Sequence, residues 1–240
     1  MKGLGRFKRK AVQFAVYGQR LYRLANKKKE LSQLPVLNLK SIQERKKTDT
    51  LFILGSSREI NKLSQEQWAH VSKHDSMGIN NFCYHDFVPD FYWLELSSNI
   101  PSMHYTFQEI KEKYSESGPA FILNYDNVRK SNIDFTKMPK EVRSVCSFVE
   151  PRIVFNGGKK EIRSKLYELN SQIRDQSVSA FSFQHVRGSL FTCLQIAWAM
   201  GYQSIVLLGV TLKDQKYFYE EIRSKNAKEK INDIIFDFIF

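Results

Sequence analysis

Short apolar runs alternate with helix-like stretches along most of this chain, and this alternation constrains its fold more than any other feature. Runs such as Thr50–Leu54 and Ser204–Leu208 are largely apolar instead of alternating apolar with polar residues. Strands of that kind are buried on both faces, which is typical of parallel sheets covered by helices. The sequence therefore predicts an α/β fold, a Rossmann-like and mostly parallel sheet with helices on both faces.

Start and stop signals place the individual elements. Ser64 and Gln67 form a capping box for one helix, Pro101 opens another, and Gly201 ends a third. We expect strands at 50–54, 76–79, 91–96, 120–123 and 204–208, with one or two more in 142–155, broken at Pro151. We expect helices at 64–73, 101–117, 159–174, 189–200 and 217–230.

The net charge of +12 is concentrated near the N-terminus. Residues 1–30 hold ten basic side chains and one acid, so the rest of the chain is nearly balanced. Their apolar residues recur with helical spacing, which predicts a basic amphipathic helix that binds an anionic membrane surface. A partner protein, or packing on the chain's own domain, is the alternative. We expect no specific nucleic-acid partner, because the folded body does not carry the basic charge.

The composition indicates two parts. Residues 1–48 are predicted to be the basic helix and a linker, with the polar stretch 40–49 in the linker, and residues 49–240 the Rossmann-like domain. No apolar run is long enough to span a membrane and no cleavage site follows the leader, so we expect a cytoplasmic protein, peripheral at the inner membrane face. Whether the chain forms oligomers, and whether residue 240 is its natural end after the apolar run 234–240, stays open.

The cysteines follow no recognised pattern. Cys83, Cys146 and Cys193 lack the spacing of a zinc or redox motif, and we expect reduced thiols in the core. The sequence accordingly predicts neither a metal nor a cofactor.

Small and polar residues follow the predicted strands, where ligands bind in parallel sheets. The first strand ends in Gly55, Ser56 and Ser57, whose N–H groups and hydroxyls suit a phosphate. The second ends in Asn80 and Asn81, whose amides suit a base or a ribose.

The later turns extend this pattern. Glu95 follows the third strand, and Arg187 stands before Gly188 and Ser189 at the start of an apolar helix. Arg187 suits a phosphate or carboxylate, and Ser189 is the expected N-cap. Gly209 follows the last strand. Turns of this kind at one sheet edge predict a nucleotide crevice.

Several segments stand in the order in which they occur in a known family. They are Leu54-Gly55-Ser56-Ser57, Gly78-Ile79-Asn80-Asn81-Phe82, Pro89-Asp90-Phe91-Tyr92, Arg187-Gly188-Ser189, and residues 199–210 with their Gly-Tyr, buried strand and Gly. Over about residues 50–219 the chain resembles the bacterial sialyltransferases of glycosyltransferase family 42, with the related motility-accessory-factor and DUF115-type proteins.

The resemblance implies an inverting, metal-independent glycosyltransferase. Its donor would be a CMP-activated sugar acid, such as sialic acid, Kdo or a relative, and its acceptor a cell-surface glycan or glycolipid. Residues 55–57 fall on the family's small-residue turn, and Asn80, Ser189 and Gly209 fall on matching positions. Thr211 stands where the family has Asp, and Lys213 where it has the first of two tyrosines; both are assigned to the nucleotide site.

The catalytic base is the main departure from the family. The family's base is a His that follows the tyrosines, and no His follows His185 here. His85 with Asp86 is the best substitute, and Tyr217 and Tyr219 lie near the tyrosine positions. Two alternatives remain: a DUF115-like transferase or pyrophosphokinase on another nucleotide, and a non-catalytic nucleotide-binding or scaffold module.

Overall fold

In a computed structural model of this chain, the structure describes residues 36–95, 100–114, 118–124, 146–149, 152–153, 159–179, 182–185, 188–210 and 216–220. The expected leader helix and most of the expected helix at 217–230 lie outside these residues. The chain divides into two compact units, Met1–Val36 and Leu37–Phe240. The elements below belong to the second unit.

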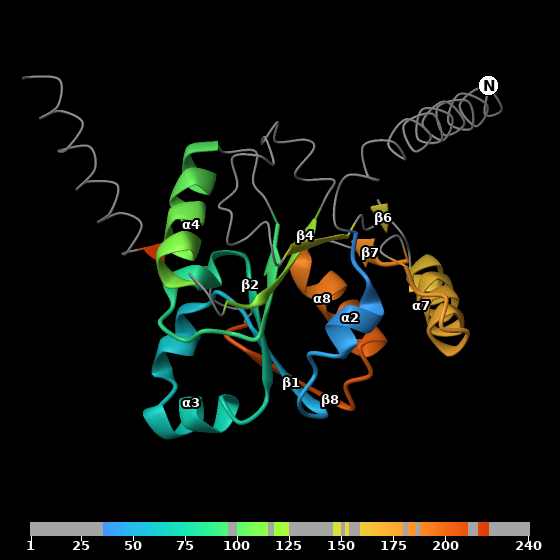
Figure 1. The fold of residues 1–240 in the computed structure, drawn as a ribbon, viewed down its shortest axis with the longest axis horizontal. Helices are drawn as coiled ribbons and strands as arrows, with labels where there is room; N and C mark the ends of the chain where they lie inside the picture. The colour runs from blue at the N-terminus through green and yellow to red at the C-terminus, as the bar shows by residue number, and fades with distance from the viewer. Residues whose placement is uncertain are drawn as a thin grey trace, which may run out of the picture. The chain divides into compact units, whose positions relative to one another are not determined.

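Within the described residues, six parallel strands form the central sheet, in the order β5-β4-β3-β2-β1-β8 (Figure 1). Strands β1 to β5 step outward in one direction, and β8 then lies on the other side of β1. The strand order therefore reverses between β1 and β8, and such a switch point is where open α/β sheets bind ligands. The strands are β1 (Thr50–Leu54), β2 (Asp75–Ile79), β3 (Phe91–Leu94), β4 (Ala120–Asn124), β5 (Cys146–Val149) and β8 (Ser204–Leu208).

One face of the sheet packs against α8 (Ser189–Ala199) and α2 (Leu39–Gln43). Side chains of alternate strand residues point to this face and form its core with both helices. The core includes Leu51, Ile53, Met77, Ile79, Phe91, Trp93, Ile122 and Val149 from the strands, Ile196 and Ala197 from α8, and Ile42 from α2.

The opposite face is covered by α3 (Gln65–Val71) and α4 (Ile100–Lys113), with the short 3-10 helices η1 (Arg58–Lys62) and η2 (Asn80–Tyr84). Phe52 of β1 lies edge-on to His70 of α3, with ring centroids 6.0 Å apart. Phe121 of β4 meets Tyr114, which follows α4, at 6.0 Å. Helices thus cover both faces, and the predicted α/β class is confirmed.

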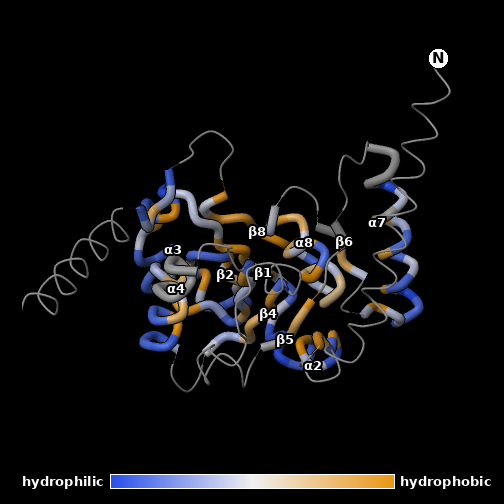
Figure 2. The backbone as a smooth tube through the Cα atoms, turned by 90° about the horizontal axis from the view of Figure 1, so that it is seen from above, coloured by the Kyte–Doolittle hydropathy of each residue, from blue (hydrophilic) through white to orange (hydrophobic). Residues whose placement is uncertain are grey.

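Beyond the main sheet lie α7 (Lys159–Arg174) and a pair of two-residue parallel strands, β6 (Arg152–Ile153) and β7 (Gln184–His185). Ile173 of α7 packs against the main core. Most of the expected elements match the observed ones, including the Ser64–Gln67 capping box and both strands around Pro151. Figure 2 shows the central strands and α8 as hydrophobic, whereas α7 is largely hydrophilic.

The stretch 40–49, expected to be part of a linker, differs from that expectation. It contributes α2, and Ile42 is buried in the core. The N–H groups of Lys47 and Thr48 donate to the Asp75 carboxylate, at 2.9 and 3.0 Å. Burial of Ile42, together with these hydrogen bonds, holds the polar segment on the body of the domain.

Two expectations near the last strand are corrected. Residues 204–208 were expected to be strongly buried, but β8 stands at the edge of the sheet that the described residues form, and Leu207 is 42% exposed. An apolar run indicates a strand and leaves its place in the sheet undetermined. Tyr217, expected to be helical, instead forms an isolated antiparallel bridge with Ser57.

A buried carboxylate ties the amino-terminal edge of the sheet together. Asp75 accepts a hydrogen bond from the hydroxyl of Tyr202, which follows α8, at 2.9 Å, in addition to the two N–H groups named above. Burial and the adjacent Asp75 carboxylate raise the pKa of Tyr202. The hydrogen bonds of Asp75 join β2, the segment before β1 and the residue after the end of α8, and so fix the position of α8 on the sheet.

Candidate functional site

The carboxyl ends of β1 and β8 meet closely at the switch point. The Gly55 N–H donates to the carbonyl of Leu208 at 2.8 Å, and the Ser57 N–H donates to that of Gly209 at 2.9 Å. A Cβ atom on Gly55 would lie 2.5 Å from the Gly209 carbonyl oxygen, so no larger residue fits without movement. The structure therefore brings together Gly55 and Gly209, two predicted site residues.

Three N–H groups in and after the turn at 55–57 donate within the protein. Besides the Gly55 and Ser57 N–H groups, the Arg58 N–H donates to the carbonyl of Lys216 at 3.3 Å. The Ser57 hydroxyl caps the Glu59 N–H, and the Ser56 hydroxyl donates to the Ile79 carbonyl at 3.5 Å. In this arrangement the three N–H groups are not available to a phosphate, and the turn acts as a junction between β1, β8 and the 216–218 segment.

Three other predicted site residues form a closed hydrogen-bonded ring, which we call the polar triad: Asn80, Glu95 and Ser189. The Asn80 side-chain amide donates to the Ser189 hydroxyl at 3.1 Å, and its carbonyl oxygen accepts from the Glu95 N–H at 2.9 Å. The Ser189 hydroxyl in turn donates to the Glu95 carboxylate. The triad lies where β2 and β3 end and α8 begins.

The backbone of Asn80 is held in an uncommon conformation. Its φ is 54°, in the left-handed region that Asn tolerates better than most residues. The buried Tyr92 hydroxyl donates to the Asn80 carbonyl and accepts from the Cys83 N–H, the latter at 2.6 Å. Burial raises the pKa of Tyr92, so it remains a neutral donor. Tyr92, on the neighbouring strand β3, thus holds η2 in place. It also holds the backbone of Asn80 so that its side chain reaches Glu95 and Ser189.

Tyr92 is a positioning residue, although the sequence placed it only in the segment Pro89-Asp90-Phe91-Tyr92 and assigned it no role. A signal was present, since a tyrosine in a fully buried strand needs a partner for its hydroxyl. The identity of that partner depends on the turn of η2 and could not be read from spacing. Asn81, also predicted for the site, follows Asn80 within η2 and is half-buried.

The N-terminus of α8 differs in detail from the expectation. Ser189 is the first residue of the helix and Gly188 is the N-cap, so the expected Ser189 N-cap is wrong. The reason is that the Ser189 hydroxyl is directed to Glu95 across the sheet edge instead of back to its own helix. Gly188 has a φ of 134°, and a Cβ there would meet no atom within 4 Å. Space therefore adjoins the helix N-terminus, whose dipole favours negative charge.

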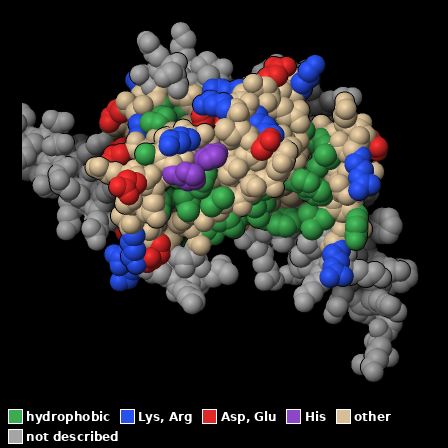
Figure 3. Space-filling model, turned by 90° about the horizontal axis from the view of Figure 1, so that it is seen from below, with side chains coloured by type: hydrophobic (Ala, Val, Ile, Leu, Met, Phe, Trp, Pro, Cys, Tyr) green, Lys and Arg blue, Asp and Glu red, His purple; other side chains and the backbone are tan. Residues whose placement is uncertain are grey.

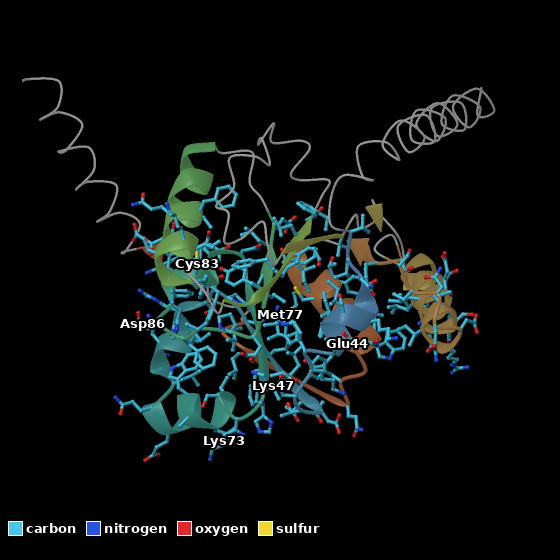
Figure 4. The ribbon with its side chains drawn as sticks, viewed as in Figure 1. Glu44, Lys47, Lys73, Met77, Cys83 and Asp86 are labelled. Carbon is cyan, nitrogen blue, oxygen red and sulfur yellow. The ribbon has the colours of Figure 1, made fainter. Side chains whose placement is uncertain are left out.

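His85, Asp86 and the two tyrosines lie on the α3–α4 side of the sheet. Figure 4 shows Cys83 and Asp86 beside α4. The His85 ring stacks on Phe82 at 5.0 Å and lies 4.7 Å from Trp68. Its Nδ1 accepts a hydrogen bond from the Phe87 N–H at 3.0 Å. Burial and the nearby Lys113 lower the pKa of His85, against the opposing effect of Asp86.

The hydrogen bond at Nδ1 affects whether His85 can act as a general base. A neutral imidazole that accepts at Nδ1 carries its proton on Nε2, so neither nitrogen is free to accept another proton in that state. The Nδ1 bond holds the turn after η2, which is a structural use of the side chain. A catalytic role for His85 would require this hydrogen bond to break.

Tyr217 and Tyr219 join the same aromatic cluster. Their rings stack at 5.2 Å, and Tyr219 also contacts Tyr84 of η2 at 5.8 Å. Phe218, between them, contacts His85 at 5.5 Å. Tyr217 remains 48% exposed and Tyr219 is buried. The predicted catalytic residues His85, Tyr217 and Tyr219 are thus brought together with η2, which carries Asn80 at its other end.

Arg187, Thr211 and Lys213, which were predicted for the nucleotide site, lie outside the described residues. Among the residues that the structure does describe, no cluster of three or more His, Cys, Asp or Glu side chains suits a metal ion. Within the same residues, no helix is both long and apolar enough to cross a membrane.

The chain matches no family model, and the search of the curated proteins finds no significant match.

Proposed function

We propose that this chain is a nucleotide-sugar-dependent glycosyltransferase whose donor site is built on the polar triad of Asn80, Glu95 and Ser189. The observation that carries the proposal is the place where the three side chains of the triad meet. Side chains from β2, β3 and α8 meet at the carboxyl edge of a parallel sheet, beside a helix N-terminus with open space at Gly188. Doubly wound sheets bind nucleotides at this edge.

The chemistry of the triad supports a nucleotide as its ligand. Asn80 offers a donor and an acceptor to a base edge, and the Glu95 carboxylate accepts from hydroxyls such as those of a ribose. The N-terminus of α8 favours an anionic group, which a diphosphate or sugar-nucleotide phosphate supplies. In the proposed complex the ligand replaces the hydrogen bonds that the three side chains now make with one another.

The donor class comes from the resemblance to the family 42 sialyltransferases. We propose a CMP-activated sugar acid, such as sialic acid, Kdo or a relative, with an inverting and metal-independent transfer to a cell-surface glycan or glycolipid. Tyr217 and Tyr219 are assigned beside the reacting sugar. The basic residues 1–30 would hold the protein at an anionic membrane surface, where such acceptors are assembled.

The test is a titration of the full chain with CMP, followed by a donor-hydrolysis assay with CMP-sialic acid and CMP-Kdo. Ser189→Ala and Glu95→Gln remove one partner each from the triad and should weaken CMP binding by about tenfold or more, since a hydrogen bond to a charged group contributes about 1.5–3 kcal/mol. Ser72→Ala, at the end of α3, is the matched control and should bind as the unchanged chain does.

The result separates the proposal from its alternatives. Binding of another nucleotide at the triad, without CMP binding, would replace the donor class and favour a DUF115-like transferase or pyrophosphokinase. CMP binding without hydrolysis or transfer would favour a non-catalytic nucleotide-binding module. Binding that survives both triad substitutions would place the site elsewhere and contradict the proposal.

A further inference from the structure

Two histidines, which we call the histidine pair, lie together where α3 ends and β2 begins. His70 belongs to the last turn of α3, and His74 directly precedes β2. Their ring centroids are 5.1 Å apart, and the Phe52 ring of β1 contacts both, at 6.0 and 5.6 Å. Figure 3 shows histidine side chains adjoining one another on the surface that it draws. The pair lies at the amino end of β2, whereas the polar triad lies at the carboxyl end of that strand.

The backbone between the two histidines is held by hydrogen bonds. The Lys73 N–H donates to the His70 carbonyl at 3.1 Å, and the His74 N–H donates to the Val71 carbonyl at 3.0 Å. Residues 70–74 therefore continue the turn of α3, and side chains four residues apart on such a turn are neighbours. Because folding already brings the two rings together, a ligand that binds both does not have to meet that entropy cost again.

The separation of the rings fits two ligands of one metal ion. A tetrahedral zinc ion binds imidazole nitrogens at about 2.0–2.1 Å, which places the centroids of two ligating rings about 5 Å apart. The observed separation is 5.1 Å. Histidines at i and i+4 are also the metal ligands of the H-E-x-x-H zinc motif. The ring separation and the sequence spacing thus point to the same kind of ligand.

One ring nitrogen of the pair lacks a hydrogen-bond partner. His74 Nδ1 is buried and makes no hydrogen bond with any residue that the structure describes. A neutral imidazole that carries its proton on Nε2 has a lone pair at Nδ1, and such a lone pair can bind a metal ion. Coordination satisfies a buried polar atom that would otherwise destabilise the fold. His70 is exposed, so its ring can turn toward the same ion.

The chemistry of the side chains determines which metal ions the pair can bind. Imidazole is a ligand of Zn²⁺, Cu²⁺ and Ni²⁺, whereas Mg²⁺ and Ca²⁺ prefer oxygen. The described residues offer no third His, Cys, Asp or Glu ligand beside the pair, so water completes the coordination. Val71 stands where the zinc motif has the Glu that acts as its general base. The pair can therefore hold an ion without the base that the motif uses for hydrolysis.

We propose that His70 and His74 form a binding site for a divalent transition-metal ion such as Zn²⁺. The ion joins the end of α3 to the residue before β2 and so stabilises the folded chain. The site lies at the other end of β2 from the polar triad, and it takes no part in the proposed sugar transfer, which remains metal-independent. This inference is therefore independent of the proposed function.

Calorimetric titration of the full chain, without a histidine tag, with ZnCl₂ tests the site. The affinity should fall as the solution is acidified, because protons compete with the metal for imidazole, and MgCl₂ should not bind the pair. His70→Ala and His74→Ala, made separately, should each weaken Zn²⁺ binding by about tenfold or more, since each leaves a single ligand. His104→Ala, which removes a histidine of α4, is the matched control and should bind as the unchanged chain does.

NMR of the histidine ring nitrogens in the unchanged chain provides a second readout, which needs no substitution and stays informative if a variant fails to fold. On addition of ZnCl₂ the ring nitrogens of His70 and His74 should shift together, and those of His85 should not. The melting temperature should also rise with ZnCl₂ in the unchanged chain and in His104→Ala, and in neither variant of the pair. Absence of Zn²⁺ binding, binding that both substitutions leave intact, or shifts confined to other histidines would each overturn the proposal.

Discussion

At the scale of single residues, Asn80 connects the backbone of the fold to the candidate site. Its left-handed backbone, its carbonyl and both side-chain polar atoms each have a defined use. The two atoms of the amide contact residues that are far apart in sequence, one at Glu95 and one at Ser189. Substitutions at Asn80 can therefore separate the contribution of its backbone conformation to stability from the contribution of its side chain to the site.

Asn80→Ala should lower the free energy of unfolding by about 3 kcal/mol, from the loss of two part-buried side-chain hydrogen bonds at about 1 kcal/mol each and the cost of a left-handed alanine. Asn80→Gly loses the same side chain but tolerates the backbone, so it should cost about 1 kcal/mol less. Urea denaturation measures both. Equal costs for the two variants would show that the backbone conformation of Asn80 adds nothing to its role.

His85 should make the stability of the protein sensitive to acid. Its pKa in the folded state is lowered by burial, so below the ordinary histidine value of about 6.5 the unfolded chain binds a proton that the folded chain resists. Its contribution is present above pH 6.5 and is lost as the pH falls. His85→Asn keeps an acceptor for the Phe87 N–H, and it should flatten this acidic decline in thermal melts between about pH 7 and 5.

The same variant tests the catalytic assignment. If His85 is the base, His85→Asn should abolish donor turnover although the protein remains folded. Retained turnover would assign His85 to the structural role that its Nδ1 hydrogen bond indicates.

At the scale of elements, the strands and helices were largely predictable because their signals are local. Apolar runs, the capping box at Ser64 and the Pro and Gly punctuation all act within a few residues. The exposure of β8 was not predictable, since it depends on which strand lies beside it. Segment 40–49 was misjudged for a similar reason, because its polar residues conceal the buried Ile42.

The candidate site was predictable in its residues and not in its contacts. The rule that ligands bind at the carboxyl ends of parallel strands pointed to Asn80, Glu95 and Ser189 one by one. Their ring of hydrogen bonds spans 109 residues from Asn80 to Ser189, and no spacing rule reaches that far. The donors of the 55–57 turn were misleading, because the N–H groups of Gly55 and Ser57 donate to the main-chain oxygens of Leu208 and Gly209.

The closure of β1 on β8 gives a prediction about two glycines. Gly55→Ala should cost about 1–3 kcal/mol, because its Cβ would meet the Gly209 carbonyl oxygen and Val210 at 2.5 and 2.8 Å. Gly201→Ala should cost about 1 kcal/mol from its φ of 78° alone, since no atom lies within 4 Å of the added Cβ. Chemical denaturation compares the two. A Gly55→Ala variant no less stable than Gly201→Ala would contradict the tight closure of the switch point.

At the scale of the whole molecule, charge separates the N-terminal residues from the body. Residues 1–30 hold most of the net charge of +12. Figure 3 shows basic and acidic side chains interspersed on the face of the described residues that it draws. Any attraction to an anionic surface should therefore depend on the N-terminal residues.

The full chain should float with vesicles that contain phosphatidylglycerol and should be released as salt is raised. Replacing Arg6, Arg9 and Lys10 together by Glu should abolish this binding and leave the melting temperature of the body unchanged. Replacing Lys62, Lys73 and Lys111 in the same way is the matched control. Equal loss in both variants would show that no particular segment directs the protein to the membrane.

The central claim is that the polar triad at the carboxyl edge binds a CMP-activated donor, and a thermal melt of the full chain with CMP tests it most directly. CDP, UDP, GDP, ATP and S-adenosylmethionine serve as comparisons. A ligand at about a hundredfold over its dissociation constant stabilises the folded state by roughly 2.7 kcal/mol, which a melt resolves. The account predicts a shift with CMP that Ser189→Ala and Glu95→Gln remove. No shift with CMP, or a shift that both variants retain in full, would contradict it.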